Sequence, residues 1–443
     1  MAGTGILLLN LGGPDSLEAV GPFLYNLFSD REIIALPGGP ALQPLLARVI
    51  ARARGPSVRR NYAGIGGKSP ILDLTRRQAA ALEAALNAGG AAASSRIGPD
   101  RGVAAGRDMP QGPFTVRIAM RYWKPDTADA LRELFGAGIT RIVALTLYPH
   151  FSAATTGSSL NELQRALDRP ELTAVLDRPE PALDLPAPQQ VLDRPEPQNA
   201  LGGPDEARLP ARGRVVSPSP LPQAPAAPAR LLRAPAGITV TAIDRYPTHP
   251  GYLEAIAATV EEALRGLPEE SRQRACLLFS AHGLPMKFIR AGDPYVREIA
   301  QTRDGVLEIL RARGWGNPWK LGYQSRTGPV KWIGPYTDRV IEELAEEGVR
   351  DIIVVPIAFV SDHIETLYEI DQLFAELARR RGIRHFIRTR MLNDDPVFIQ
   401  ALAGMVRNHL SDGGMGAGAP SQAAGDQAGH HHGSGLARPT PVR

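Results

Sequence analysis

The sequence predicts an α/β protein made of two similar lobes, each a parallel sheet flanked by helices. First, apolar runs rich in β-branched residues alternate with helical patterns along the chain. The most complete run, 352–360, is nearly continuous, which is typical of a parallel strand buried on both faces. Second, polar residues repeatedly follow these runs, at the strand ends where open α/β sheets bind ligands. Third, 443 residues are enough for two such lobes.

The order of the elements follows from the same patterns. The first strand begins at Gly5 and breaks into a turn at Gly12 and Gly13, where Asp15 and Ser16 are candidate caps for the next helix. Further strands are expected at 114–123, 139–149, 238–246, 275–281, 319–325, 352–360 and 385–393. Helices are expected at 16–28, 75–88, 127–138, 252–267, 293–314, 337–348 and 396–410.

Three segments lack a core-forming pattern. Residues 88–112 are rich in Ala, Gly and Arg and have no period, so we expect a mobile loop. Proline recurs every few positions across 168–236, where the phrase Val-Leu-Asp-Arg-Pro-Glu-Pro occurs twice, so this stretch is predicted to be a disordered insert. The Gly- and Ala-rich residues 411–443 are predicted to be a disordered tail. The first lobe is then expected at 1–247 and the second at 248–394.

Composition argues against several classes of protein. The net charge is only +4 and the basic residues are scattered, which disfavours nucleic-acid binding. A single cysteine, Cys276, excludes a disulfide framework and a cysteine-held iron–sulfur cluster. No apolar run reaches the roughly 18 residues that a membrane-spanning helix needs, and the first strand begins without a preceding signal peptide. We therefore expect a cytoplasmic protein.

Two strand ends carry the residues best suited to chemistry. His282 directly follows the strand at 275–281, where a histidine can act as a base near neutral pH; a histidine satisfied by backbone partners is the alternative. Glu365 and Glu369 are four residues apart, so they share a helical face and favour a proton or a metal cation between them. Acids that only stabilise the start of a helix are the alternative reading of this pair.

The segment 36–62 is amphipathic and basic. Apolar residues at helical spacing lie beside arginines in this segment: Leu42, Leu45, Leu46, Val49, Arg48, Arg52, Arg54, Arg59 and Arg60. Such a segment could rest on an anionic membrane surface or accept an acidic ligand, with a solvated helix face as the alternative. Gly67-Lys68-Ser69 is similar to the end of a phosphate-binding P-loop, but Tyr62 stands where that motif needs glycine, so nucleotide binding is rejected.

Seven motifs make the chain recognisable. They are, in order, LLLNLGGPDS, IGGKSPI, TTGSSLNE, IDRYPTHP, FSAHGLPM, GYQSRTGPVKWIGPYT and PIAFVSDHIETLYEID. Together they resemble ferrochelatase, which inserts ferrous iron into a porphyrin in haem synthesis. The resemblance covers nearly all of the chain outside 88–112, 168–236 and 411–443. It implies two Rossmann-like lobes of the class II chelatase type with a cleft between them, and a last helix, 395–410, that packs back on the first lobe.

The resemblance also implies roles for individual residues. His282 would take protons from pyrrole nitrogens or bind the incoming metal, and Glu365 would be its acidic partner across the cleft. Asp362 and His363 would help to hold that acid, and a π-type turn would place Glu369 on the same inward line. Residues expected to line or grip the porphyrin and its propionates are Arg54, Tyr62, Ser69, Arg121 and Trp332.

Two departures limit what the resemblance carries. Many family members continue the acidic line with a third acid, but this position is Leu373 here, so the resemblance implies no carboxylate at the outer end of a metal route. The cysteine-rich extension of animal enzymes is absent, so no iron–sulfur cluster is expected. Fe²⁺ is expected only as a substrate, and no permanently bound cofactor is implied.

The expected reaction is insertion of Fe²⁺ into protoporphyrin IX to form protohaem. Coproporphyrin III is the alternative substrate, although its four propionates would call for more basic groups. A cobalt or nickel chelatase for reduced tetrapyrroles is disfavoured because those proteins are typically shorter. A haem or porphyrin carrier is the non-catalytic alternative. A carrier could use Arg54 and Trp332 but would not need His282 facing Glu365.

Overall fold

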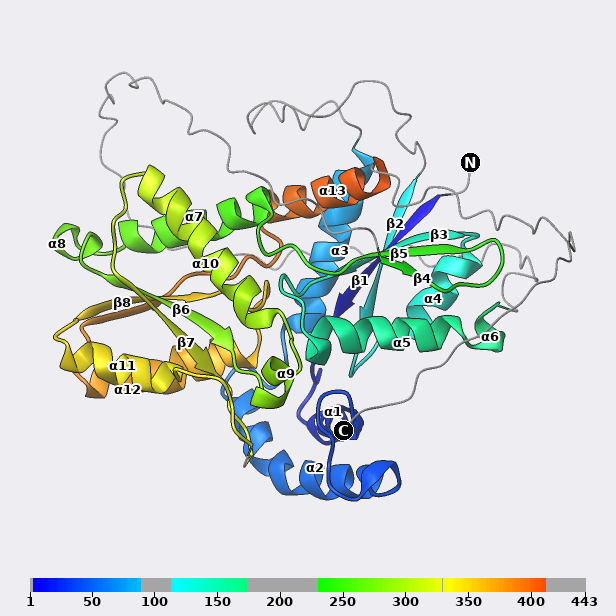
Figure 1. Cartoon of the computed structure of the whole chain (residues 1–443), viewed down its shortest axis with the longest axis horizontal. Helices are drawn as coiled ribbons and strands as arrows, with labels where there is room; N and C mark the ends of the chain where they lie inside the picture. The colour runs from blue at the N-terminus through cyan, green and yellow to red at the C-terminus, as the bar shows by residue number, and fades with distance from the viewer. Residues whose placement is uncertain (1–2, 89–112, 174–229, 329, 412–443) are drawn as a thin grey trace, which may run out of the picture.

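Two separate sheets form the framework of the computed structural model, which describes residues 3–88, 113–173, 230–328 and 330–411 (Figure 1). The first sheet comprises, in spatial order, β2 (Phe114–Met120), β1 (Thr4–Asn10), β3 (Arg141–Thr146), β5 (Thr239–Ile243) and β4 (Arg230–Leu232). The second comprises β7 (Trp319–Gln324), β6 (Cys276–His282), β8 (Asp351–Pro356) and β9 (His385–Arg388). All neighbouring strands are parallel except β4 and β5.

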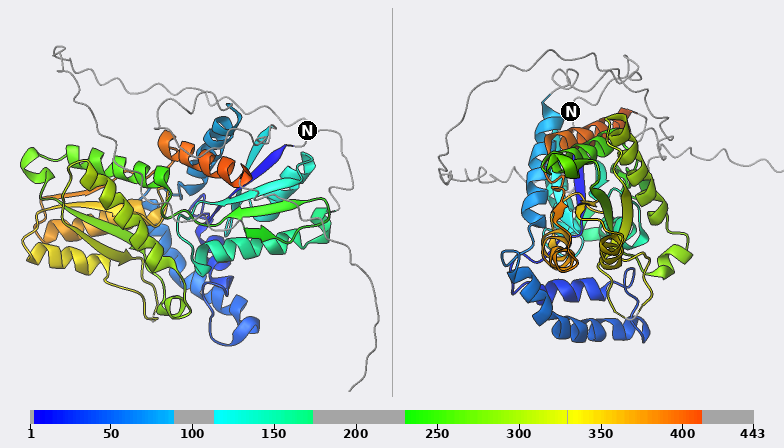
Figure 2. Two further views of the ribbon diagram at one scale, coloured as in Figure 1. Left: turned by 45° about the horizontal axis from the view of Figure 1, so that its top comes forward. Right: turned by 90° about the vertical axis from the view of Figure 1, so that its left-hand side faces the viewer.

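Helices flank both sheets, as Figures 1 and 2 show, so the predicted α/β fold with two lobes is confirmed. Those before β5 are α1 (Val20–Ser29), α2 (Gly39–Ala63), α3 (Ile71–Asn87), α4 (Thr127–Gly136), the π-helix η1 (Ala153–Gly157), α5 (Ser158–Leu167) and α6 (Pro170–Thr173). Those after β5 are α7 (Pro250–Arg265), α8 (Glu269–Arg272), α9 (Met286–Arg290), α10 (Tyr295–Ala312), α11 (Thr337–Glu346), the π-helix η2 (Glu365–Phe374), α12 (Ala375–Arg380) and α13 (Pro396–Ser411).

The inner strands are buried on both faces because helices cover both sides of each sheet. Residues 6–9 of β1 and 352–355 of β8 are at most 2% exposed. The strand predicted at 352–360 nevertheless ends at Pro356. β9 ends at Arg388, opposite Val354, and so offers no partner to the later residues. Residues 357–360 instead form a mostly buried loop that leads to η2.

The prediction that 168–236 is a disordered insert is wrong at both ends of the segment. Its first residues form α6, in which Leu172 is fully buried, and its last residues include β4, in which Leu232 is buried against the core of the first lobe. Each end contributes one leucine to a core, a signal too short to stand out beside the prolines. The remainder, 174–229, lies outside the described residues, as do 89–112 of the predicted loop and 412–443 of the predicted tail.

The start of the first helix differs from prediction, and the last helix makes contacts that bear on the predicted lobes. The first helix begins at Val20 and not at Ser16, because the Ser16 hydroxyl accepts a hydrogen bond from the Ala19 amide (3.2 Å) and closes a turn before the helix. The last helix contacts both α3 and α7, and Arg407 Nη2 donates to the Ala85 carbonyl (2.7 Å). α13 therefore joins the two halves of the chain, and the lobe boundary at 247 stays a prediction.

α1 and α2 pack on each other and lie together to one side of both sheets in Figures 1 and 2. Their shared core contains Val20, Phe23 and Phe28 from α1 and Tyr62 from α2. The outer face of α2 leaves large apolar side chains in solvent: Leu42 (47% exposed), Leu45 (58%) and Val49 (54%). α2 thus forms most of the basic segment with exposed apolar residues that was expected at 36–62.

Candidate active site

The carboxyl ends of three neighbouring strands build the candidate site. β6 lies between β7 and β8, and its last residue, His282, is in register with Gln324 at the end of β7. β8 ends at Pro356 beside β6, and the chain then continues through the loop into η2. Because the three strands are parallel, their carboxyl ends meet at one edge of the sheet. The side chains that follow each strand therefore lie close together.

His282 and Glu365 are in direct contact. His282 Nδ1 donates to Glu365 Oε2 over 2.8 Å. Both residues belong to the second lobe and their side chains touch, so the expectation that Glu365 faces His282 across the cleft is wrong. β6 and β8 are neighbours, and the loop after β8 returns Glu365 to the end of β6.

The contact changes the acidity of both groups. Burial lowers the pKa of His282, but the charge and hydrogen bond of Glu365 outweigh it, so this pKa lies above its usual value. Burial raises the pKa of Glu365, but the charge and hydrogen bond of His282 hold it below its usual value. The pair is therefore a carboxylate that stabilises an imidazolium, which is what a proton-accepting histidine needs.

Glu369 lies beside this pair. Its Oε2 accepts hydrogen bonds from Ser325 Oγ (2.5 Å) and Gln324 Nε2 (3.1 Å), and Gln324 also donates to the Glu365 carbonyl (3.2 Å). Burial raises the pKa of Glu369, and the Glu365 charge raises it further. Glu369 is thus the more basic of the two carboxyl groups and can hold a proton that Glu365 cannot.

The π-helix η2 carries both acids, in agreement with the π-type turn that was expected. His363 supports its start: the Glu365 amide donates to His363 Nδ1 (3.1 Å), and burial lowers the pKa of His363, which keeps the ring neutral. Asp362 Oδ1 accepts from the Thr366 hydroxyl (3.0 Å). Asp362 and His363 therefore fix the backbone on which Glu365 stands.

Aromatic side chains surround His282. The Trp332 ring centroid lies 6.3 Å from that of His282, and Trp332 Nε1 donates to the Thr327 carbonyl (2.9 Å). Phe359 lies on the loop after β8, 6.0 Å from the His282 ring. Tyr295, the first residue of α10, donates its hydroxyl to the His282 carbonyl (3.0 Å). Flat apolar faces beside a base suit a planar aromatic substrate.

Two of the expected porphyrin-lining residues are buried in the first lobe, and Tyr62 lies close enough to Glu365 to feel its charge. Tyr62 at the end of α2 is buried, and burial together with the Glu365 charge raises its pKa, so that it stays protonated. Ser69 is buried against the glycine turn, where its amide donates to the Pro14 carbonyl (2.7 Å). A Cβ on Gly13 would lie 2.5 Å from Ser69 Oγ, so only glycine allows this approach.

The two expected arginines lie elsewhere. Arg54 is exposed on α2, with its guanidinium carbon 5.7 Å from the centroid of the Phe28 ring. Arg121 Nη2 forms a 2.7 Å ion pair with Asp30, and Arg121 Nε donates to Ser158 Oγ (2.8 Å). A propionate would therefore have to compete with Asp30 for Arg121.

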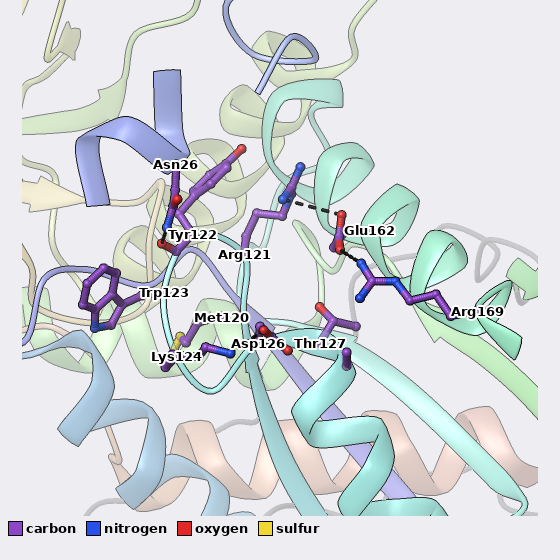
Figure 3. A pocket seen from close by; sticks show the side chains of 11 residues that line it. Asn26, Met120, Arg121, Tyr122, Trp123, Lys124, Asp126, Thr127, Glu162 and Arg169 are labelled. Atoms are coloured by element: carbon purple, nitrogen blue, oxygen red, sulfur yellow. Dashed lines mark hydrogen bonds and ion pairs between the residues drawn. The ribbon is translucent and has the colours of Figure 1, made fainter. Parts of the chain in front are cut away.

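A cavity of about 410 Å³ lies beside Arg121 (Figure 3). Its lining residues are Asn26, Met120, Arg121, Tyr122, Trp123, Lys124, Asp126, Thr127, Ala128, Glu162 and Arg169. Figure 3 shows Glu162 between Arg121 and Arg169, with ion-pair distances of 3.8 and 3.6 Å. None of His282, Glu365 and Glu369 lines this cavity, so it is separate from the proton-accepting pair.

Sequence reasoning gave no role to Ser325, Tyr295 or Asp30. Ser325 has a left-handed backbone (φ 65°), which is costly for a residue with a Cβ and directs its hydroxyl to Glu369. Its place directly after β7 is the signal that could have found it. Asp30 ends α1 and Tyr295 begins α10, and their partners are distant in sequence. No local pattern identifies either of them.

Comparisons with known proteins show which proteins this chain is similar to. The family model named ferrochelatase matches residues 3–178 and 226–410. A protein named ferrochelatase from Geotalea uraniireducens is 41% identical over 410 residues, covering 92% of this chain and 98% of the relative. One of the same name from Synechococcus elongatus is 39% identical over 412 residues, covering 93% and 83%. Among solved structures, SirB from Bacillus subtilis with Fe3+ aligns at 10% identity with a TM-score of 0.45, covering 94% of this chain and 98% of that one.

In the part of the chain that the structure describes, no helix is long and apolar enough to cross a membrane. The family match spans both sheets and includes every residue of the His282–Glu365–Glu369 cluster. The chain belongs to the ferrochelatase family, the enzymes that insert Fe²⁺ into a porphyrin in haem biosynthesis.

Proposed function

We propose that this enzyme inserts Fe²⁺ into protoporphyrin IX, with His282 and Glu365 as the catalytic pair. The observation that carries the proposal is the 2.8 Å contact between His282 Nδ1 and Glu365 Oε2 at the end of the second sheet. Insertion forms bonds from iron to the pyrrole nitrogens and releases two N–H protons. Neutral His282 accepts a proton at Nε2, since Nδ1 is bonded to Glu365, and the carboxylate stabilises the resulting imidazolium.

Glu369 can accept the protons that leave the porphyrin. Its raised pKa makes it a better proton acceptor than Glu365, and Ser325 and Gln324 hold its carboxylate in place. Fe²⁺ binds imidazole well, and carboxylate oxygens suit a cation that is losing its water. The same three side chains can therefore receive the metal and disperse the protons, with the porphyrin held between the lobes.

The apolar outer face of α2 supports protoporphyrin as the substrate and a membrane surface as a partner. Leu42, Leu45 and Val49 are each about half exposed, and exposed arginines lie beside them on the same helix: Arg48, Arg52, Arg54, Arg59 and Arg60. Such a helix binds anionic lipid through buried apolar area and charge. Protoporphyrin IX carries only two propionates and collects at such surfaces, whereas coproporphyrin III, with four, would need further cations.

Anaerobic turnover with Fe²⁺ tests the substrate directly. We expect kcat/KM for protoporphyrin IX to exceed that for coproporphyrin III, and the opposite order would overturn this part of the proposal. His282→Ala should lower turnover by roughly 10²–10⁴-fold, the usual contribution of a positioned acid–base group. His385→Ala is a matched control because His385 Nδ1 also contacts a carboxylate, Asp351, at 2.6 Å, but at the opposite edge of the sheet. If the protein were only a carrier, the wild type and both variants would bind porphyrin, and none of the three would insert metal into it.

Liposome co-sedimentation tests the membrane contact. Wild-type protein should bind vesicles that contain anionic lipid, and binding should fall as salt is added. Leu45→Ser with Val49→Ser should weaken it, because both side chains are exposed on α2. Binding that ignores lipid charge and salt, or that the double variant leaves unchanged, would contradict the proposal.

A further inference from the structure

The π-helix that carries both acids is unusually long. η2 runs for ten residues, from Glu365 to Phe374, whereas η1 is a five-residue segment. π-Helical hydrogen bonds are rare and are found mostly as single turns, so a ten-residue run needs support from outside the helix. Glu365 and Glu369 also repel one another along this segment. Contacts with residues outside η2 must therefore hold it in the π form.

Arg388, the last residue of β9, binds acidic residues in η2 and in the loop before it. Its Nε and Nη2 donate to the two carboxylate oxygens of Asp371, each over 2.8 Å. Its Nη1 lies 3.1 Å from Asp362 Oδ1. Parallel paired bonds of this kind are the strongest and most directional that arginine makes with a carboxylate. The guanidinium thus joins a residue before η2 to a residue within it.

The two acids gripped by Arg388 bracket the two acids of the active site. Asp362 precedes Glu365 by three residues, and Asp371 follows Glu369 by two. The Arg388 side chain is 12% exposed and that of Asp362 19%, so their contact is largely shielded from water, whereas the Asp371 side chain is 35% exposed.

Asp362 is itself fixed to the frame of the lobe. Asn393 Nδ2 donates to Asp362 Oδ2 (2.9 Å), and the Asp362 amide donates to Asn393 Oδ1 (2.9 Å). Asn393 Nδ2 and the Arg388 guanidinium therefore hold the two carboxylate oxygens from different directions. Arg388 consequently joins Asp371, inside the helix, to Asp362, which Asn393 holds outside it.

Loss of the contacts between Arg388 and the two acids would change the direction in which the Glu369 side chain points. An α-helix advances roughly 100° per residue and a π-helix roughly 80°, because its rings are wider. A return to α-helical winding would therefore turn Glu369 by roughly 80° relative to Glu365, away from Ser325 and Gln324. Asp371 would turn further still and leave the guanidinium. The paired bonds to Asp371 are thus compatible only with the π form.

We propose that Arg388 is a positioning residue for metallation, which holds η2 in its π form and thereby keeps Glu365 and Glu369 directed toward His282. This inference rests on the proposed function of that pair. Arg388 touches neither metal nor porphyrin and acts only through Asp362 and Asp371. It should therefore affect the metal and proton steps and leave porphyrin affinity unchanged.

Arg388→Gln, compared with Arg390→Gln, tests the proposal. Arg390 lies two residues away and also pairs with two acids, Glu262 (2.7 Å) and Asp395 (2.9 Å), but it makes no ion pair with η2. We expect Arg388→Gln to lower kcat/KM for Fe²⁺ by roughly 10–100-fold, as outer-shell partners of metal-handling residues do, with the KM for porphyrin within about twofold. Arg390→Gln should leave both values near those of the wild type.

Hydrogen–deuterium exchange gives a readout that does not depend on activity. Amides 365–374 should exchange faster in Arg388→Gln, while the strands of the second sheet keep their protection. Asp371→Asn should reproduce both effects, and the double variant should be no worse than either single variant, because the two residues act as a unit. If Arg388→Gln does not fold, Arg388→Lys, which keeps the charge but not the paired bonds, should show an intermediate loss.

Two results would overturn the inference. One is Fe²⁺ insertion by Arg388→Gln that matches Arg390→Gln. The other is exchange at 365–374 that stays at the wild-type rate while turnover falls. If the enzyme prefers coproporphyrin III, the substrate proposal fails, but the Arg388 comparison can be made with that porphyrin and keeps its meaning.

Discussion

Breaking the buried ion pair between Arg121 and Asp30 should destabilise the first lobe. Asp30 is 6% exposed and Arg121 13%, and the Asp30 carboxylate also accepts hydrogen bonds from Tyr122 Oη (2.6 Å) and Ser158 Oγ (2.8 Å). Removing one partner of a buried pair leaves the other charge without compensation, which costs about 3–5 kcal/mol. Asp30→Ala should lower the free energy of unfolding by that amount. Asp30→Asn, which keeps an acceptor for the hydroxyls, should cost about 1.5–3 kcal/mol.

Urea unfolding at neutral pH measures this cost, with Lys68→Gln as the control. Lys68 pairs with Asp73 at 2.6 Å, a distance similar to that of the buried pair, but both side chains are 53% exposed. Exposed pairs contribute about 0–1 kcal/mol, so the control should be nearly neutral. If Asp30→Ala were no more costly than Lys68→Gln, burial would not decide the strength of these ion pairs and the reasoning would be refuted.

Four further predictions concern the site and the segment 179–225. The histidine NMR signal of His282 should titrate above pH 6.5 in the wild type and at a lower pH in Glu365→Gln, where only the Glu369 charge still opposes the effect of burial; a midpoint that does not move would contradict the assigned cause. Because only neutral His282 accepts a proton, wild-type turnover should rise as pH increases through that value. Gly13→Ala should push Ser69 away and weaken porphyrin binding in a fluorescence titration, with unchanged affinity as the contrary result. Deletion of 179–225, which the family model does not match, should leave turnover near wild type, and a large loss would show a role for that segment.

The sheets could be predicted from sequence because their signal is local. Residues 352–355 are β-branched and apolar on both faces, which is the pattern typical of a parallel strand buried on both faces. The same reasoning placed His282 at a strand end, where the structure has it. The resemblance to a family then supplied Glu365 as the partner of His282. The sequence could not show that the two side chains touch, since this depends on β6 and β8 being neighbours.

Contacts between distant segments account for the rest. The pairing of Arg121 with Asp30 joins residues 91 apart, and no spacing rule connects them. Arg388 lies on an edge strand with no motif around it, and its meaning comes only from the acids that it contacts. β4 was hidden because three residues beside a proline-rich stretch carry too little pattern, although its pairing with β5 is clear in the structure.

The most direct test of the catalytic pair is anaerobic Fe²⁺ insertion by Glu365→Gln, with porphyrin affinity measured on the same protein. Glutamine keeps the size of the side chain and can still accept a hydrogen bond from His282, but it has no charge to stabilise an imidazolium or attract Fe²⁺. The pairing at 2.8 Å predicts a fall in kcat of roughly 10²–10⁴-fold with an unchanged porphyrin Kd. Turnover near the wild-type rate would contradict the central claim that His282 and Glu365 carry out metallation together.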